Sequence, residues 1–143
     1  MNNRTLAIIK PDAIRKNYIG QIITRITEAG FRIRAMKMVR VSRSSAEGFY
    51  RIHKGRPFYE PLIDYITSEP VIAIALEKEN AVKDFRKLIG ATDPAKAEEG
   101  TIRKLYAINT RENAIHGSDS DENAAIEISH FFSNHELLNN YND

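Results

Sequence analysis

One histidine, His116, lies in the stretch of the chain best suited to chemistry, Asn-Ala-Ile-His-Gly-Ser-Asp-Ser at residues 113–120. Gly117 removes side-chain bulk beside the imidazole, and Asp119 with Glu122 has the spacing of a helix-capping box. A histidine between a strand end and a helix N-terminus lies where backbone N–H groups favour anions. The stretch therefore predicts a nucleophile that accepts phosphate, although a lone histidine near a turn is more often a polar residue without catalytic function.

Side chains that could hold phosphate oxygens occur at the ends of predicted elements. The chain contains neither G-x-x-x-x-G-K-[ST] nor G-x-G-x-x-G, so side chains would have to hold any nucleotide. Arg86, Thr92 and Arg103 flank a long loop and offer two cations and a hydroxyl. Taken singly, both arginines would be ordinary surface residues. Lys10 is different, because a lysine that ends an apolar strand must find a partner.

Two aromatic side chains could bind a base. We expect Tyr50 and Phe58 in one helical segment near the Gly55-Arg56-Pro57 turn, where one ring could stack and the phenol could donate a hydrogen bond. Taken alone, Phe58 would be assigned to the hydrophobic core. The pair is informative only together with the phosphate-binding candidates.

The composition is that of an ordinary globular protein. With 143 residues, we expect a single domain over residues 1–143. The net charge of +2 is too small to imply nucleic acid and equally suits a small anionic ligand. The chain has no cysteine, and its longest apolar run, residues 71–76, is too short to span a bilayer. We expect a cytoplasmic protein that needs no membrane and no nucleic acid.

Hydrophobic periodicity predicts four strands and several helices. In the second strand the odd positions are largely apolar, and Arg32, Arg34 and Arg40 would lie on the other face. Residues 71–76 form an unbroken apolar run, which predicts a central strand buried on both faces. We expect strands at residues 5–9, 31–41, 71–76 and 105–108, and helices at 19–29, 46–52, 57–67, 80–89 and 119–132.

The order of these elements predicts an α/β (α+β) fold of the ferredoxin-like β-α-β-β-α-β type, with an antiparallel sheet and added helices. Residues 91–100 are irregular and contain Pro94, and a long loop in a compact domain is usually functional or mobile. The last helix should bury an apolar stripe. The stripe comprises Ala124, Ala125, Ile128, Phe131 and Phe132.

Together, four fragments resemble the nucleoside diphosphate kinase family, and the resemblance covers essentially the whole chain. Each fragment alone is only moderately specific, but their order and spacing match no other family that we considered. The fragments are R-T-L-A-I-I-K-P-D-A at residues 4–13, G-F-Y-R-I-H-K-G-R-P-F at 48–58, G-A-T-D-P-A at 90–95 with G-T-I-R at 100–103, and N-A-I-H-G-S-D-S at 113–120.

The resemblance implies a phosphotransferase that moves the terminal phosphate of a nucleoside triphosphate, mainly ATP, to a nucleoside diphosphate. It implies a ping-pong mechanism through a phosphohistidine on His116, with broad base and sugar tolerance. Glu127, helped by Ser118, would orient and polarise the imidazole. The other positions that match the family's residues are Lys10, Tyr50, Arg86, Thr92 and Arg103 for the phosphates, Lys10 and Asn113 for the ribose 3′-hydroxyl, and Phe58 for base stacking.

The resemblance also implies a cofactor and an assembly. Mg²⁺ would travel with the nucleotide phosphates rather than in a protein site. His130 and His135 are five residues apart and would not share a helix face, so a metal site built from them is not expected. The family implies a homo-oligomer built from dimers, either a hexamer or a tetramer. Glu112 stands where some relatives carry arginine, which we take to be outside the chemistry.

Two alternatives remain open from the residues. One is a phosphohistidine carrier that receives phosphate from a partner protein, which would need neither Phe58 nor the two-arginine loop. The other is a non-enzymatic RNA-binding or regulatory module, since fold alone does not determine function. Such a module would expose aromatic side chains on its sheet and carry a stronger basic face, whereas Phe31 is the only phenylalanine in the predicted strands.

Overall fold

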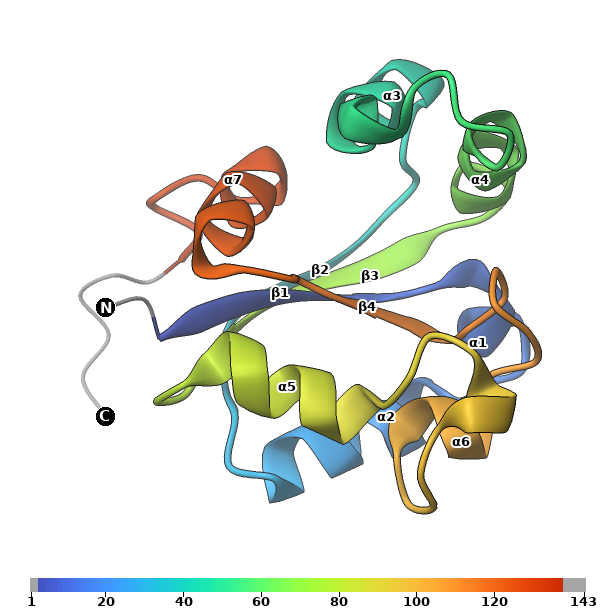
Figure 1. The fold of residues 1–143 in the computed structure, drawn as a ribbon. Coiled ribbons are helices and arrows are strands. Elements are labelled where there is room, and N and C mark those ends of the chain that lie inside the picture. Colours follow the sequence, from blue (N-terminus) through green and yellow to red (C-terminus); the bar gives the residue numbers. More distant parts are fainter. Residues whose placement is uncertain (1–2, 138–143) are drawn as a thin grey trace.

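A four-stranded antiparallel sheet forms the centre of the molecule, with helices on both faces (Figure 1). The computed structural model describes residues 3–137. The strand order is β2-β3-β1-β4, which puts β3 and β1 in the middle. The strands are β1 (Arg4–Ile9), β2 (Arg32–Val39), β3 (Val71–Glu77) and β4 (Ile115–Gly117).

Helices connect the strands in the order predicted for a ferredoxin-like fold, with α3 and α4 inserted between β2 and β3. This confirms the predicted α/β class and its antiparallel sheet. No helix among residues 3–137 combines the length and apolar character needed to cross a membrane. The helices are α1 (Pro11–Arg15), α2 (Ile19–Glu28), α3 (Arg43–Phe49), α4 (Tyr59–Ile66), α5 (Ala81–Ile89), α6 (Ile102–Tyr106) and α7 (Asp121–Phe131), with 3-10 turns η1 (Arg51–His53) and η2 (Pro94–Lys96).

The core has two parts because successive side chains of each strand point to opposite faces. On β1, Ala7 and Ile9 join the cluster beneath α2, α5 and α6, whereas Leu6 and Ile8 join the cluster beneath α3, α4 and α7. Figure 1 shows these two helical layers above and below the sheet. An RNA-binding module that reads bases on an open sheet would need one uncovered face, and both faces of this sheet are covered.

The predicted last strand at residues 105–108 is wrong, and this part of the chain contains α6 instead. Thr101 begins the helix, since its hydroxyl accepts a hydrogen bond from the backbone N–H of Lys104. The fourth strand lies later and is only three residues long. His116 is therefore inside β4, paired with Ile8 of β1, rather than just beyond a strand end.

The predicted alternation of β2 fails at a register shift between Ile33 and Ala35. A β-bulge adds a residue to one strand, so it changes the face to which side chains point. Arg34, expected on the solvent face, is buried and forms an ion pair with Glu77 at 3.2 Å. Beyond the bulge Met36 is exposed, so an apolar side chain occupies one of the even positions that the alternation places on the exposed face.

The last helix begins later than expected. Ser120, not Asp119, caps α7 by accepting a hydrogen bond from the backbone N–H of Asn123. Asp119 accepts instead from the Asn123 side chain. Ala125 of the predicted apolar stripe is exposed, because the buried line follows Ala124 and Ile128 at helical spacing.

Gly117 permits α5 to pack closely against β4. A Cβ atom at this position would lie 2.9 Å from Cδ2 of Phe85 and 3.0 Å from Cδ1 of Ile89, both buried on α5. We predict that Gly117→Ala lowers the melting temperature, because overpacking a dense core costs about 1–3 kcal/mol. Gly20→Ala is the control, since nothing lies within 4 Å of its added Cβ. Equal melting temperatures for the two variants, measured by circular dichroism, would contradict this packing.

Candidate active site

The orientation of His116 follows from the pairing of β4 with β1. His116 is opposite Ile8, whose side chain lies in the core cluster on the α7 side of the sheet. From α7, Glu127 reaches back, and its Oε1 lies 2.8 Å from Nε2 of His116. An ionised carboxylate can only accept hydrogen bonds, so Nε2 carries the proton and Nδ1 keeps its lone pair. The imidazole is thereby held in the tautomer in which Nδ1 can act as a nucleophile.

Ser118 fixes the position of Glu127. Its hydroxyl is buried, donates to the same Oε1 at 2.7 Å and accepts from the backbone N–H of Leu6 at 3.1 Å. One carboxylate oxygen thus receives hydrogen bonds from both the imidazole and a serine tied to β1. This arrangement is the one expected for a carboxylate that orients a histidine.

Lys10 and Asn113 meet because they flank the paired strands. Lys10 follows β1 and Asn113 lies two residues before β4, and in an antiparallel pair these two ends are neighbours. The buried Lys10 Nζ donates to Oδ1 of Asn113 at 2.8 Å. Burial, and then the nearby Arg103 charge, lower the pKa of Lys10 to about 8, so the ammonium remains mainly charged at neutral pH. The predicted partner of the strand-end lysine is therefore an amide rather than a carboxylate.

Two backbone carbonyls hold Arg103 in place. Its Nη1 donates to the carbonyl of Gly90 at 3.1 Å and its Nη2 to that of Ile115 at 2.8 Å. Gly90, which ends α5 with φ of +89°, has no room for a Cβ beside Thr101. Burial, and then the charge of Arg86, lower the pKa of Arg103 to about 10. Arg103 is 9% exposed, and at this pKa it remains cationic at neutral pH.

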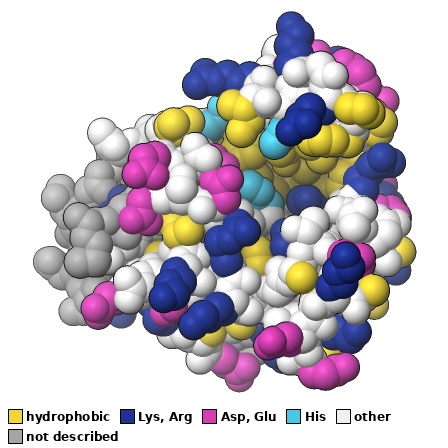
Figure 2. Space-filling model, viewed as in Figure 1, with side chains coloured by type: hydrophobic (Ala, Val, Ile, Leu, Met, Phe, Trp, Pro, Cys, Tyr) yellow, Lys and Arg dark blue, Asp and Glu magenta, His cyan; other side chains and the backbone are white. Residues whose placement is uncertain are grey.

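A cavity of about 340 Å³ opens in front of His116. Within residues 3–137, neither Arg86 nor Arg103 forms an ion pair with a carboxylate. Figure 2 shows the hollow between the α3–α4 lobe and the lower layer, with Lys and Arg side chains around it. Two uncompensated cations beside a hollow favour an anionic ligand. Six of the predicted residues line the cavity: Tyr50, Arg86, Thr92, Arg103, His116 and Glu127.

The structure separates Tyr50 from Phe58, which were predicted in one helical segment. Tyr50 is the C-cap of α3, and Phe58 is the N-cap of α4. Burial, and then the Glu127 charge, raise the pKa of Tyr50, so its hydroxyl stays protonated and can donate. Phe58 is 43% exposed rather than in the core, and its ring lies 5.3 Å from that of His53, which lines the cavity. An exposed ring beside the cavity is free to stack on a planar ligand.

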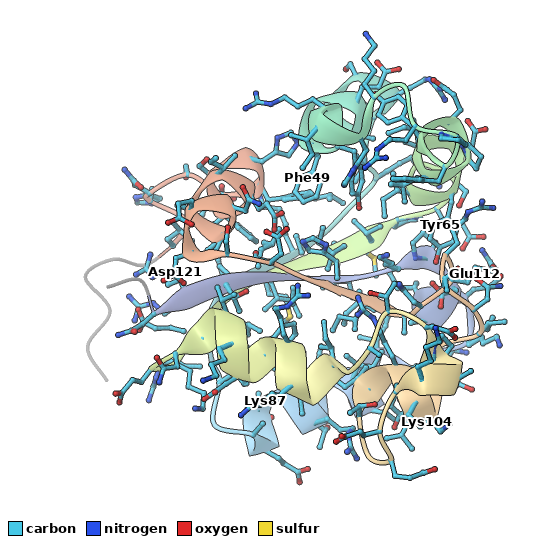
Figure 3. All side chains as sticks on the ribbon, viewed as in Figure 1. Phe49, Tyr65, Lys87, Lys104, Glu112 and Asp121 are labelled. Carbon is cyan, nitrogen blue, oxygen red and sulfur yellow. The ribbon has the colours of Figure 1, made fainter. Side chains whose placement is uncertain are left out.

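Phe49 is a cavity residue that the sequence did not reveal. Its ring meets that of His116 edge to face, with centroids 5.6 Å apart, and also contacts Tyr50 and His130. Figure 3 shows Phe49 pointing from α3 into the space beside α7. Its neighbour Tyr50 was the only sequence signal, because contacts between α3 and α7 join residues far apart in the chain.

The lowered pKa of Lys10 predicts a pH-dependent affinity for ADP. As the pH rises through about 8, Lys10 loses its proton in the free protein and with it the attraction for phosphate. We expect the affinity, measured by calorimetry, to fall between pH 7 and 9. Lys10→Gln should bind ADP weakly and without that fall. An undiminished affinity of the unmodified protein at pH 9 would show that Lys10 does not hold the phosphates.

Comparisons with known proteins identify the family. The family model described as nucleoside diphosphate kinase matches residues 3–137. The nucleoside diphosphate kinase of Chloroherpeton thalassium is 58% identical over 137 residues, covering 96% of this chain and 97% of that protein. That of Salinibacter ruber is 51% identical over 137 residues, covering 96% of each.

Solved structures of the same family superimpose closely. The nucleoside diphosphate kinase of Aquifex aeolicus gives a TM-score of 0.94 at 41% identity, covering 96% of this chain and 100% of that one. The Halobacterium salinarum enzyme, solved in complex with CDP, gives 0.94 at 35% identity, covering 100% of this chain and 95% of that one. The chain belongs to the nucleoside diphosphate kinase family.

Proposed function

We propose that this chain transfers the terminal phosphate of a nucleoside triphosphate to a nucleoside diphosphate, with His116 as the phosphate carrier. The observation that carries this proposal is the hydrogen bond from His116 Nε2 to Glu127, which leaves the Nδ1 lone pair available beside a cationic cavity. A phosphohistidine carrier that receives phosphate from a partner protein would not need Phe58, the proposed base-stacking residue beside the cavity. The family supports direct transfer between nucleotides.

The reaction has two halves. In the first, Nδ1 of His116 attacks the terminal phosphorus in line, the bond to the bridging oxygen breaks, and the nucleoside diphosphate leaves with that electron pair. The ring then carries positive charge, which the Glu127 carboxylate stabilises through Nε2–H, and Ser118 keeps that carboxylate in place. In the second half, a terminal phosphate oxygen of another diphosphate attacks the phosphohistidine, and the ring returns to its neutral form.

Lys10, Arg86 and Arg103 supply positive charge to the phosphates. Phosphoryl transfer requires mainly alignment and charge stabilisation. Within residues 3–137 Arg86 and Arg103 form no ion pair, and Lys10 has the Asp12 carboxylate nearby. Thr92 and the protonated Tyr50 hydroxyl add hydrogen-bond donors along the same cavity. All five groups would therefore contact the transferred and leaving phosphates.

Mg²⁺ fits this site as a companion of the nucleotide. Residues 3–137 hold no group of three histidine, cysteine or acidic side chains placed to bind a metal. Asp119, at the cavity wall, is a carboxylate that could hold water bound to the ion. When bound, the ion would neutralise phosphate charge.

The sugar and base would lie toward the α3–α4 hairpin. Lys10 and Asn113, already hydrogen-bonded to each other, offer a donor and an amide to the ribose 3′-hydroxyl. Phe58 would stack on the base. Because stacking accepts any π-face, the site would tolerate all common bases, and it makes no demand on the ribose 2′-position.

We also propose a homo-oligomer, hexameric or tetrameric and built from dimers, working in the cytoplasm. β2 forms one edge of the sheet, and Met36 and Met38 on it are 49% and 56% exposed. A strand edge with exposed methionines is suited to pairing with another chain. The lack of cysteine suits a reducing compartment.

The phosphoenzyme is the direct test of the nucleophile. We predict that the protein incubated with Mg-ATP alone becomes phosphorylated and releases ADP, with a linkage that is lost in acid and survives base, unlike phosphoserine. His116→Ala should abolish both the phosphoenzyme and the turnover, because it removes the imidazole that Glu127 orients. Glu127→Gln cannot stabilise the charged ring and should slow transfer about 10²–10³-fold.

His130→Ala is the matched control, because this imidazole also lines the cavity but bonds to the Ser45 hydroxyl. It should still form the phosphoenzyme. Phosphate on His130, an acid-stable linkage, or normal turnover in His116→Ala would refute the proposal. Transfer from ATP to GDP with no other protein present distinguishes the kinase from a phosphate carrier.

Replacing Phe58 tests the base site. We predict that Phe58→Ala raises KM for ADP, GDP, CDP and UDP by similar factors, since stacking contributes about 1–3 kcal/mol per base. Ile52→Ala, which removes an exposed apolar side chain from the same rim, should change KM little. Steady-state kinetics with each diphosphate measures both. A loss confined to one base would reveal a base-reading contact instead of stacking.

A further inference from the structure

Asp12 is a buried carboxylate that the proposed reaction does not use. It is completely buried in the first turn of α1, two residues after Lys10. Its Oδ2 accepts the backbone N–H of Ala114 at 3.1 Å, and its Oδ1 accepts the hydroxyl of Tyr65 from α4. A buried carboxylate is costly unless its oxygens are hydrogen-bonded. Both oxygens are bonded here, and one of the donors lies two residues before the nucleophile.

Ala114 has a backbone conformation that its side chain disfavours. Its φ is +73°, in the left-handed region. The N–H of Ile115 bonds back to the carbonyl of Asn113 at 2.8 Å, so Ala114 is the centre of a tight three-residue turn of the strained γ type. Strained residues persist only where the surrounding structure holds them.

The peptide groups of Ala114 are held on both sides. Its N–H is bound by the Asp12 carboxylate, and its carbonyl accepts the backbone N–H of Lys10 at 2.9 Å. The turn connects Asn113, which binds Lys10 Nζ, to His116, which binds Glu127. The turn therefore sets the distance between the hydrogen-bonded pair Lys10–Asn113 and His116, the proposed nucleophile.

We propose that Asp12 is a positioning residue, whose carboxylate holds Ala114 in the strained turn that aligns Asn113 and His116 for phosphoryl transfer. This rests on the proposed nucleophile. The structural reason is that no other side chain within residues 3–137 bonds to the Ala114 N–H. Without that acceptor, the turn would relax toward negative φ and shift His116 relative to the phosphates. In Figure 3, Tyr65 lies at the same end of the molecule as Glu112, whose loop leads into the turn at Ala114.

The hypothesis requires a hydrogen-bond acceptor at position 12 rather than a negative charge. Asp12→Ala should lower the single-turnover rate of His116 phosphorylation about 10–100-fold, because a shift of about 1 Å has that effect. The rate should fall more than KM rises, since Arg86 and Thr92 of the long loop form no hydrogen bond with Asp12 within residues 3–137. Asp12→Asn keeps one acceptor oxygen and can donate to the Tyr65 oxygen, so it should retain most of the rate.

A second-site change distinguishes positioning from general stability. Glycine adopts positive φ without strain, so Ala114→Gly should restore much of the rate lost in Asp12→Ala, as measured by rapid-quench phosphorylation. Asp64→Ala, which removes an exposed carboxylate next to Tyr65 on α4, is the control and should behave like the unmodified protein. If Asp12→Ala does not fold, the double variant should fold and transfer phosphate.

Any of three results would overturn the inference: a normal rate in folded Asp12→Ala, an Asp12→Asn variant as slow as Asp12→Ala, or no recovery with Ala114→Gly. Failure of the double variant to fold would also overturn it. The unmodified protein tests the proposed nucleophile separately from the role of Asp12. If it forms no phosphohistidine on His116, the nucleophile assignment fails, whereas the results above refute only the assignment of Asp12.

Discussion

The short antiparallel pairing of β4 with β1 is the interaction on which the site depends. Three residue pairs, from Ile9 with Ile115 to Ala7 with Gly117, bring the end of β1 that precedes Lys10 beside the strand that carries His116, the proposed nucleophile. Lys10 then meets Asn113, and Leu6 reaches the Ser118 hydroxyl at the other end. A register shift of one residue would turn His116 toward the opposite face of the sheet, away from Glu127. The site therefore requires this register.

Charge in the site is divided between the two helical layers. The lower layer and its loop bring Arg86 and Arg103, which have no acidic partners within residues 3–137. The upper layer brings Glu127, whose bonded oxygen accepts from the imidazole and from a serine. His116 lies between them. The imidazole thus has arginines on the cavity side and a carboxyl group behind the ring, an arrangement that would stabilise positive charge on the histidine in the proposed transfer.

The strongly periodic elements could be predicted from the sequence, whereas the elements that shape the site could not. The buried run at residues 71–76 and the α2 stripe have clear patterns, and both exist. β4 has only three residues, too few for a pattern, and α6 has apolar residues that also suit a strand. The burial of Arg34 depends on a bulge in β2, which simple alternation cannot represent.

The candidate site residues were named from short motifs, but the contacts that hold them join distant parts of the chain. Lys10 and His116 were named from local context, and the six predicted cavity residues do line one cavity. Phe49 and Asp12 were given no role, because their significance depends on pairing with α7 and with the turn at Ala114. Local sequence identifies groups capable of chemistry, and tertiary contacts determine their orientation.

Polar contacts join the two halves of the proposed site, in addition to the apolar packing of α3 and α4 on the sheet. The α3–α4 hairpin carries Tyr50 and Phe58, and the sheet with the lower layer carries His116, Arg86 and Arg103. Tyr65 joins the hairpin to Asp12, and the Ser45 hydroxyl joins it to His130 on α7. Because the Tyr65 bond ends on the carboxylate that also holds Ala114, a movement of α4 would act directly on the turn before His116. The α3–α4 hairpin, proposed to bind the base, and the turn before His116 therefore share the buried Asp12 carboxylate as a common support.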